Sequence, residues 1–203
     1  MVMKRIYNYV SRHISTIILK NKKEDEIDWI ELAYKKAMEK NEVPEISDFT
    51  TFLAACFYMC NPGSYGSKIQ NRIMEDYSFK TVDKELNSGD FKVTEMTKFS
   101  LFKFDVGDKI EFKVSYLTKD NYWNLLQLRP YQSFKYYVFL LINPFEKCKY
   151  EWFIIDKNEF GEVFPKLGGC HGTKESNEEN KNKNYRLTVN KKVYEKLKKI
   201  NKI

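Results

Sequence analysis

Three residues near the middle of the chain have the types and spacing of a site that hydrolyses phosphate esters. Glu111 and Lys113 lie two residues apart in an otherwise apolar stretch, so on a β-strand their side chains point to the same face. Charges in such surroundings are costly to bury unless they are paired or bind a metal. Asp90 follows Gly89 further upstream. If the fold brings Asp90 and Glu111 together, their oxygens suit a hard divalent cation such as Mg²⁺.

Lys113 would complete such a site. A lysine beside a metal can orient or deprotonate an attacking water and can stabilise the charge that grows on a phosphate. Asp90, Glu111 and Lys113 are therefore predicted to be catalytic, with Asp90 and Glu111 as the Mg²⁺ ligands, in phosphodiester hydrolysis. The alternative is that Glu111 and Lys113 form the solvated face of an amphipathic strand, because E-x-K occurs by chance in many proteins.

The elements that must position these residues follow from the spacing of apolar side chains. Helical spacing predicts helices over 4–20, 24–40, from Ser47 onward and over 68–77. Aromatic and β-branched residues then predict strands over 79–82, 90–96, 101–104, 110–117, 136–142 and 150–155. Further helices are expected over 121–132 and 158–167, a loop over 168–184, an edge strand over 185–189 and a basic C-terminal helix. This order predicts an α/β or α+β fold, with a mixed β-sheet flanked by helices in three layers and an N-terminal helical region.

The first metal ligand depends on how the chain turns before Glu111. Residues Asp105 to Asp108 read as a tight hairpin turn, which would place Glu111 opposite Phe102 and leave Asp90 upstream. Either the segment 94–104 is an insertion, or Asp105 or Asp108 replaces Asp90 as the ligand. Glu75, on the helix over 68–77, is a further carboxylate that either reaches the metal or lies on the surface.

Charge and composition bound the partners. The chain has 203 residues with 35 Lys and Arg against 28 Asp and Glu, and its whole excess of +7 lies C-terminal to residue 165. A localised basic stretch favours a polyanionic partner. No apolar stretch approaches the roughly 20 residues that span a bilayer, and the N-terminus has no secretory pattern, so we expect a cytoplasmic protein. The four cysteines have no metal-ligand spacing and are expected to be reduced thiols.

The motifs together resemble the PD-(D/E)xK nuclease superfamily, with Gly89 in the place of the proline. More specifically, they look like a family of small bacterial type II restriction endonucleases over roughly residues 66–189. The segments that carry the resemblance are Gly66 to Gln70, Ser88 to Asp90, Glu111 to Tyr116, Leu126 to Gln132 and Cys170 to Thr173. The resemblance implies a restriction-endonuclease-like core over 66–190, between an N-terminal helical region over 1–65 and a basic C-terminal helix over 191–203.

The resemblance also implies contacts with double-stranded DNA. Arginine can contact phosphate or guanine, and glutamine suits adenine edges or the backbone. The alternative for the cluster over 127–132 is a hydrogen-bonded support of the active strand, and the alternative for the histidine is a solvated side chain. The residues expected at DNA are Lys68, Gln70, Gln127, Arg129, Gln132, His171 and Thr173.

The leading hypothesis is a Mg²⁺-dependent type II restriction endonuclease that cuts double-stranded DNA at a short specific sequence. One small subunit with one site then implies a homodimer, a paired second subunit or sequential nicking, because two strands are cut. The alternatives are a non-catalytic DNA-binding or specificity subunit and a structure-specific repair nuclease. The chain has only two histidines, so its composition does not favour a nuclease or hydrolase site built on histidines.

Overall fold

The computed structural model describes residues 49–60, 64–77, 79–81, 89–94, 104–169 and 184–203. The helices expected over 4–20 and 24–40, and nearly all of the strand expected over 101–104, lie outside these residues. The chain divides into two compact units, one formed by Met1–Ile69 with Asn143–Lys149 and the other by Gln70–Ile142 with Tyr150–Ile203. In the described residues, no helix is both long and apolar enough to cross a membrane.

The first unit contains helix α3 (Phe49–Met59) and the start of helix α4 (Tyr65–Tyr77). Both helices confirm the sequence prediction. Leu53 and Cys56 are fully buried on α3, one turn apart in part of the apolar pattern that predicted this helix.

Two cysteines on adjacent turns of this unit differ in their acidity. Cys56, Cys60 and Cys148 are free thiols. A hydrogen bond from the Cys56 thiol, together with the positive charge of Lys68, lowers the pKa of Cys60 to about 7 although burial opposes the shift. The same hydrogen bond and burial raise the pKa of Cys56, and burial raises the pKa of Cys148 to about 12. Cys60 is thus the reactive thiol among the three.

We therefore expect iodoacetamide to alkylate Cys60 before Cys56 and Cys148, because the thiolate is the nucleophile. The labelling rate should rise with pH and reach half its maximum near pH 7, the pKa of Cys60. Peptide mass spectrometry over a pH series measures this rate, with Cys60→Ser as the control. A midpoint near the ordinary thiol value of about 8.5 would contradict the assignment.

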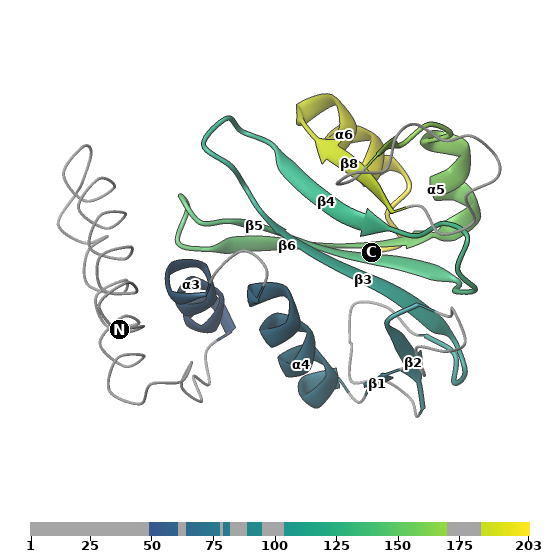
Figure 1. The fold of residues 1–203 in the computed structure, drawn as a ribbon, viewed down its shortest axis with the longest axis horizontal. Helices are drawn as coiled ribbons and strands as arrows, with labels where there is room; N and C mark the ends of the chain where they lie inside the picture. Colours follow the sequence, from purple (N-terminus) through teal and green to yellow (C-terminus); the bar gives the residue numbers. More distant parts are fainter. Residues whose placement is uncertain (1–48, 61–63, 78, 82–88, 95–103, 170–183) are drawn as a thin grey trace, which may run out of the picture. The chain divides into compact units, whose positions relative to one another are not determined.

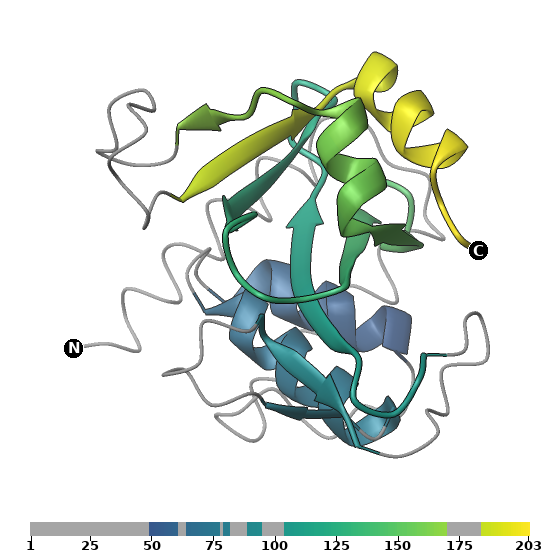
Figure 2. The same cartoon turned by 90° about the vertical axis from the view of Figure 1, so that its right-hand side faces the viewer.

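The second unit is built on a five-stranded mixed sheet, ordered β1-β2-β3-β5-β6 (Figures 1 and 2). Strands β1, β2 and β3 pair antiparallel, and β3 pairs parallel with β5. This mixed sheet confirms the expected strand content of the region. The strands are β1 (Phe79–Thr81), β2 (Phe91–Val93), β3 (Lys109–Tyr116), β5 (Tyr136–Asn143) and β6 (Lys149–Asp156).

A second sheet of three strands covers one face of the first, with two short helices beside it (Figures 1 and 2). Side chains from both sheets and both helices form one buried core, which includes Leu125, Phe139, Phe153, Phe160 and Leu197. The second sheet has the order β4-β8-β7. Its strands and the helices are β4 (Trp123–Leu128), β7 (Gly168–Gly169), β8 (Tyr185–Val189), α5 (Lys157–Val163) and α6 (Lys191–Lys199).

The helix expected over 121–132 is wrong, because β4 occupies this segment. Leu125 pairs with Leu187 on β8, but Leu128 pairs with Tyr185, so β4 carries one extra residue in the ladder. The extra residue is a β-bulge, where Gln127 takes a φ of 55°. The bulge returns Leu128 to the core side, and the spacing from Leu125 to Leu128 therefore imitates a helical face.

The other elements of this unit follow the sequence more closely. Helix α5 and the basic helix α6 confirm the prediction, and the side chain of Asn190 caps α6 by accepting a hydrogen bond from the backbone of Val193. Strand β8 is confirmed as a strand but was wrongly expected at an edge, since it lies between β4 and β7. The short strand β7 falls in the expected loop over 168–184. The fold is a mixed α+β fold with two sheets.

Candidate active site

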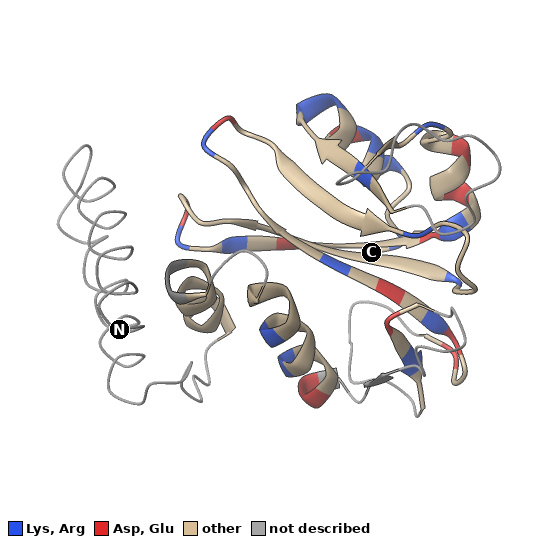
Figure 3. Ribbon diagram, viewed as in Figure 1, with Lys and Arg blue, Asp and Glu red and all other residues tan. Residues whose placement is uncertain are grey.

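The pairing of β2 with β3 brings Asp90 to Glu111. Phe91 lies opposite Ile110, so the next position of the same register places Asp90 across from Glu111. The amide of Asp90 continues this pairing by donating a hydrogen bond of 2.8 Å to the carbonyl of Ile110. Along β3, basic and acidic residues alternate, so that Lys109, Glu111 and Lys113 share one face (Figure 3).

The turn at Asp105 to Asp108 does not pair β3 with the segment just before the turn. Gly107 donates a hydrogen bond of 2.8 Å to the carbonyl of Val93, and Val93 donates one of 2.9 Å to the carbonyl of Asp108. The chain therefore leaves β2 after Val93 and returns beside it, and the partner of β3 is β2. This pairing corresponds to the alternative in which the segment 94–104 is an insertion. Asp90 therefore remains at the site.

The ammonium of Lys113 joins both carboxylates. Its Nζ atom lies 2.9 Å from Asp90 Oδ2 and 2.8 Å from Glu111 Oε1. It donates hydrogen bonds to Asp90 Oδ2 and to the carbonyl of Phe112, and its contact with Glu111 is an ion pair without hydrogen-bond geometry. Asp90 Oδ2 also accepts a hydrogen bond of 3.0 Å from the amide of Phe112. The three predicted catalytic residues thus form one connected cluster.

This cluster is buried. The side chain of Glu111 is 0% exposed, that of Lys113 is 14% exposed and that of Asp90 is 20% exposed, so a solvated strand face is the wrong interpretation of these charges. Burial raises the pKa of Glu111 above its usual range, against the opposing effect of the Lys113 charge. Neither carboxylate oxygen of Glu111 receives a hydrogen bond within the described part of the chain. Glu111 is therefore a fully buried carboxyl group whose charge partner is the Lys113 ammonium at 2.8 Å.

The burial of Glu111 should make the free energy of unfolding depend on pH. Because the pKa of Glu111 is raised on folding, the unfolded chain ionises first, and the free energy of unfolding falls as pH rises from about 4.3 through the folded pKa. In the absence of divalent cations, Glu111→Gln should remove this fall, matching the wild type at low pH and exceeding its stability at higher pH. Urea unfolding in EDTA over a pH series measures the difference. The exposed Glu162 supplies the control substitution Glu162→Gln; a gap between Glu111→Gln and wild type that does not grow with pH would contradict the prediction.

A glycine makes the approach of β2 to β3 possible. Gly89 has a φ of 79°, and a Cβ atom built on it would lie 2.8 Å from the carbonyl oxygen of Ile110 and 3.1 Å from Cβ of Phe134. Proline, which is fixed near a φ of −65°, cannot adopt this conformation. Gly89 therefore occupies the proline position of the expected motif with a backbone conformation that proline does not allow.

We expect Gly89→Ala to destabilise the protein more than Gly107→Ala does. Both glycines have positive φ, but a Cβ on Gly107 meets nothing within 4 Å, so Gly107→Ala tests the conformational penalty alone, about 1–2 kcal/mol. Gly89→Ala adds a clash with backbone that cannot move without displacing Asp90. Urea unfolding of both variants provides the comparison, and equal losses would show that the close approach at Gly89 carries no cost.

The donor set fits a magnesium ion. Mg²⁺ is commonly bound through one or two carboxylates together with waters and substrate phosphates. Asp90 and Glu111 supply two such carboxylates, 2.9 and 2.8 Å from the Lys113 ammonium, and their oxygens would be the ligands of the metal. Among the described residues, no group of three or more His, Cys, Asp or Glu side chains gathers to hold a metal. The two carboxylates are thus the protein ligands that these residues provide.

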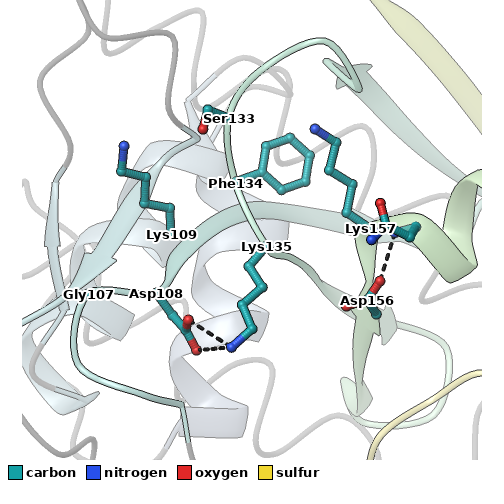
Figure 4. A pocket seen from close by; sticks show the side chains of 9 residues that line it. Gly107, Asp108, Lys109, Ser133, Phe134, Lys135, Asp156 and Lys157 are labelled. Atoms are coloured by element: carbon teal, nitrogen blue, oxygen red, sulfur yellow. Dashed lines mark hydrogen bonds and ion pairs between the residues drawn. The ribbon is translucent and has the colours of Figure 1, made fainter.

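The alternative ligands lie elsewhere. Asp108 and Asp105 pair with Lys135, whose Nζ atom is 2.9 Å from Asp108 Oδ1 and 3.4 Å from Asp105 Oδ2 (Figure 4). The hydrogen bond with Asp108 is the largest of the effects that raise the pKa of Lys135. Glu75 is exposed on α4. Asp90 is therefore the carboxylate that reaches the Glu111 and Lys113 pair.

The expected DNA-contacting cluster on and after β4 divides into two kinds of residue. Gln127 is exposed at the bulge. Gln132 is 8% exposed, its carbonyl accepts a hydrogen bond of 2.6 Å from Lys157 Nζ, and its side-chain oxygen has no partner in the described residues. Arg129 lowers the pKa of Glu111 by its charge and donates a hydrogen bond of 3.1 Å to Asn184. Arg129 is thus half-buried and Gln132 buried, whereas Gln127 is exposed.

No described contact joins the other residues that were predicted to bind DNA to the carboxylates of Asp90 and Glu111. Lys68 is exposed on α4 in the first unit, where its charge acts on Cys60. Gln70 is half-buried on α4 at the start of the second unit. His171 and Thr173 lie outside the described residues.

One neighbour of the cluster was missed at the sequence level. Tyr137 lies opposite Glu111 in the parallel pairing of β5 with β3, and its side chain is fully buried. Burial and the Glu111 charge raise the pKa of Tyr137, and its hydroxyl has no hydrogen-bond partner among the described residues. The continuous apolar run of β5 predicts a buried strand, but no signal in the sequence gives its register against β3.

The comparisons with protein-family models and with curated proteins identify no relative of this chain. No protein-family model matches the chain, and no curated protein matches it significantly. The function is therefore argued from the residues of this site.

Proposed function

We propose that this chain is a Mg²⁺-dependent nuclease that hydrolyses phosphodiester bonds in double-stranded DNA. The observation that carries the proposal is the fully buried Glu111 carboxylate, which shares the single Lys113 ammonium with a second carboxylate, that of Asp90. A purely structural ion pair gains little from such burial, because desolvation offsets the attraction. A site that exchanges its charge partners during a reaction explains the arrangement better.

Each residue has a distinct role in this proposal. Asp90 and Glu111 hold the cation, which when bound polarises the phosphate and lowers the pKa of an attacking water. Lys113 forms an ion pair with each carboxylate in the free protein. With a divalent cation held by the two carboxylates, the Lys113 ammonium would be available to donate to a phosphate oxygen and to orient the water. Arg129 adds positive charge near Glu111.

We further propose that the enzyme is a type II restriction endonuclease that acts at a short specific sequence. The support is the resemblance of the motifs around Asp90 and Glu111 to that family, together with the basic C-terminal part of the chain. The strand that replaces the expected helix over 121–132 is a departure from this resemblance. Cutting both strands would require a homodimer or a paired second subunit.

Substitutions at the cluster test the catalytic role. Lys113→Ala should slow cleavage at least ~100-fold, the loss seen when a preorganised electrostatic donor is removed. Lys113→Arg should also be badly impaired, because the guanidinium spreads the charge over a wider, planar group in place of a compact ammonium. Asp90→Asn and Glu111→Gln should abolish cleavage while DNA binding in Ca²⁺ persists. Single-turnover cleavage of a plasmid at saturating enzyme, with and without Mg²⁺, isolates the chemical step from binding.

Asp108→Asn is the matched control, because Asp108 is a carboxylate that pairs with a lysine outside the cluster. It should keep most of the activity. A Lys113→Ala rate within a few-fold of wild type would refute the site, and a wild-type protein that binds DNA without cutting it would favour the non-catalytic subunit. Discrete fragments from a long DNA support the restriction enzyme, whereas cuts confined to junctions or flaps favour a repair nuclease.

A further inference from the structure

Two lysines face one another across β2 and β3, next to the carboxylates. Lys92 lies directly opposite Lys109 in the antiparallel register. Side chains at such positions lie on one face with their Cβ atoms about 4.5–5.5 Å apart, and like charges placed there repel one another. The pair therefore opposes the pairing of β2 with β3, the same pairing that positions Asp90.

No described residue relieves this repulsion. Lys113 and Lys135, the neighbouring lysines, are both paired with carboxylates. Neither Lys92 nor Lys109 has an ion pair or a side-chain hydrogen bond with any residue that the structure describes. Lys92 is exposed and Lys109 is partly exposed. Both ammonium groups are accordingly available to an anion from outside.

The lysine pair lies on the same face as the cluster. Lys92 follows Asp90 by two residues and Lys109 precedes Glu111 by two, so each is one full side-chain repeat, roughly 6.6 Å, along its strand. Glu111 is fully buried, and exposure increases from it toward Lys109 and Lys92. The face therefore opens to solvent beside the carboxylates.

Lys109 lies in an open pocket whose wall carries three lysines and the two carboxylates Asp108 and Asp156. Lys109 lines an open pocket of about 430 Å³ together with Ser133, Phe134, Lys135 and Lys157 (Figure 4). The Lys157 ammonium lies 4.7 Å above the Phe134 ring, and burial lowers its pKa. Lys135 forms an ion pair with Asp108. Lys109 lines the same pocket and has no ion pair with any described residue.

We propose that Lys92 and Lys109 together bind a backbone phosphate of the DNA strand next to the phosphate that is cut. This proposal rests on the proposed nuclease function and adds a substrate-positioning site to it. Two ammonium groups on one face match the spread negative charge of a phosphodiester, and phosphate contacts fix the register of DNA on a protein. A bound phosphate would relieve the repulsion between the lysines, which no described residue does, so the pair favours bound DNA.

The test compares two double variants that each lose two positive charges. Lys92→Gln with Lys109→Gln removes the proposed phosphate site. Lys119→Gln with Lys147→Gln is the matched control, because both of its lysines are exposed in turns and have no described partner. Fluorescence anisotropy with a DNA duplex in Ca²⁺ over a KCl series gives the slope of log affinity against log salt. Each lost phosphate contact should reduce this slope by about 0.9, so the double variant Lys92→Gln with Lys109→Gln, which loses one phosphate contact, should lose about 0.9 and the control should lose nothing.

Stability separates a binding role from a structural one. The melting temperature of the Lys92→Gln and Lys109→Gln double variant should equal or exceed that of the wild type, because a repulsion is removed. An unchanged slope, an equal loss in the control, or a variant that fails to fold would each overturn the inference, and the nuclease function would stand if the wild type still cuts DNA with Mg²⁺. A wild type that neither binds nor cuts DNA would overturn both.

Discussion

The burial of one carboxylate is the constraint on which the site depends. Glu111 is fully buried on a central strand, where an unpaired charge would be very costly. Lys113 on the same strand face and Asp90 on the neighbouring strand form the charge cluster that makes this burial possible. Gly89 is needed in turn, because only a residue without Cβ lets Asp90 come this close to β3. The burial of the Glu111 carboxylate thus depends on the backbone conformation of Gly89.

Local spacing was sufficient to predict much of this arrangement. The two-residue repeat of a strand places Glu111 and Lys113 on one face whatever the rest of the fold does. The partner of that pair was harder to identify, because the choice between Asp90 and Asp108 depends on strand register. The hydrogen bonds between Val93 and the turn residues settle that register, and they join positions whose intervening sequence carries no signal for it. Tyr137 was missed for the same reason, since parallel pairing joins distant segments.

The failure at β4 has a different physical origin. Periodicity arguments assume regular elements, and a single bulge changes a strand spacing into one that looks helical. Leu125 and Leu128 both face the core because Gln127 takes a left-handed conformation between them. A single sequence contains nothing that marks Gln127 for this role, because the conformation is imposed by pairing with β8. Tertiary context therefore decided the secondary structure of this segment.

The way in which the chain returns to β2 has a consequence for evolution and engineering. Val93 and the turn at Gly107 and Asp108 are tied by two backbone hydrogen bonds, so the segment between them begins and ends at one place. The entropy of closing a loop grows only slowly with its length, so once its ends are fixed, adding residues costs little. The register that carries Asp90 is thus fixed by Val93, Gly107 and Asp108 themselves, and it does not require a particular length of chain between them.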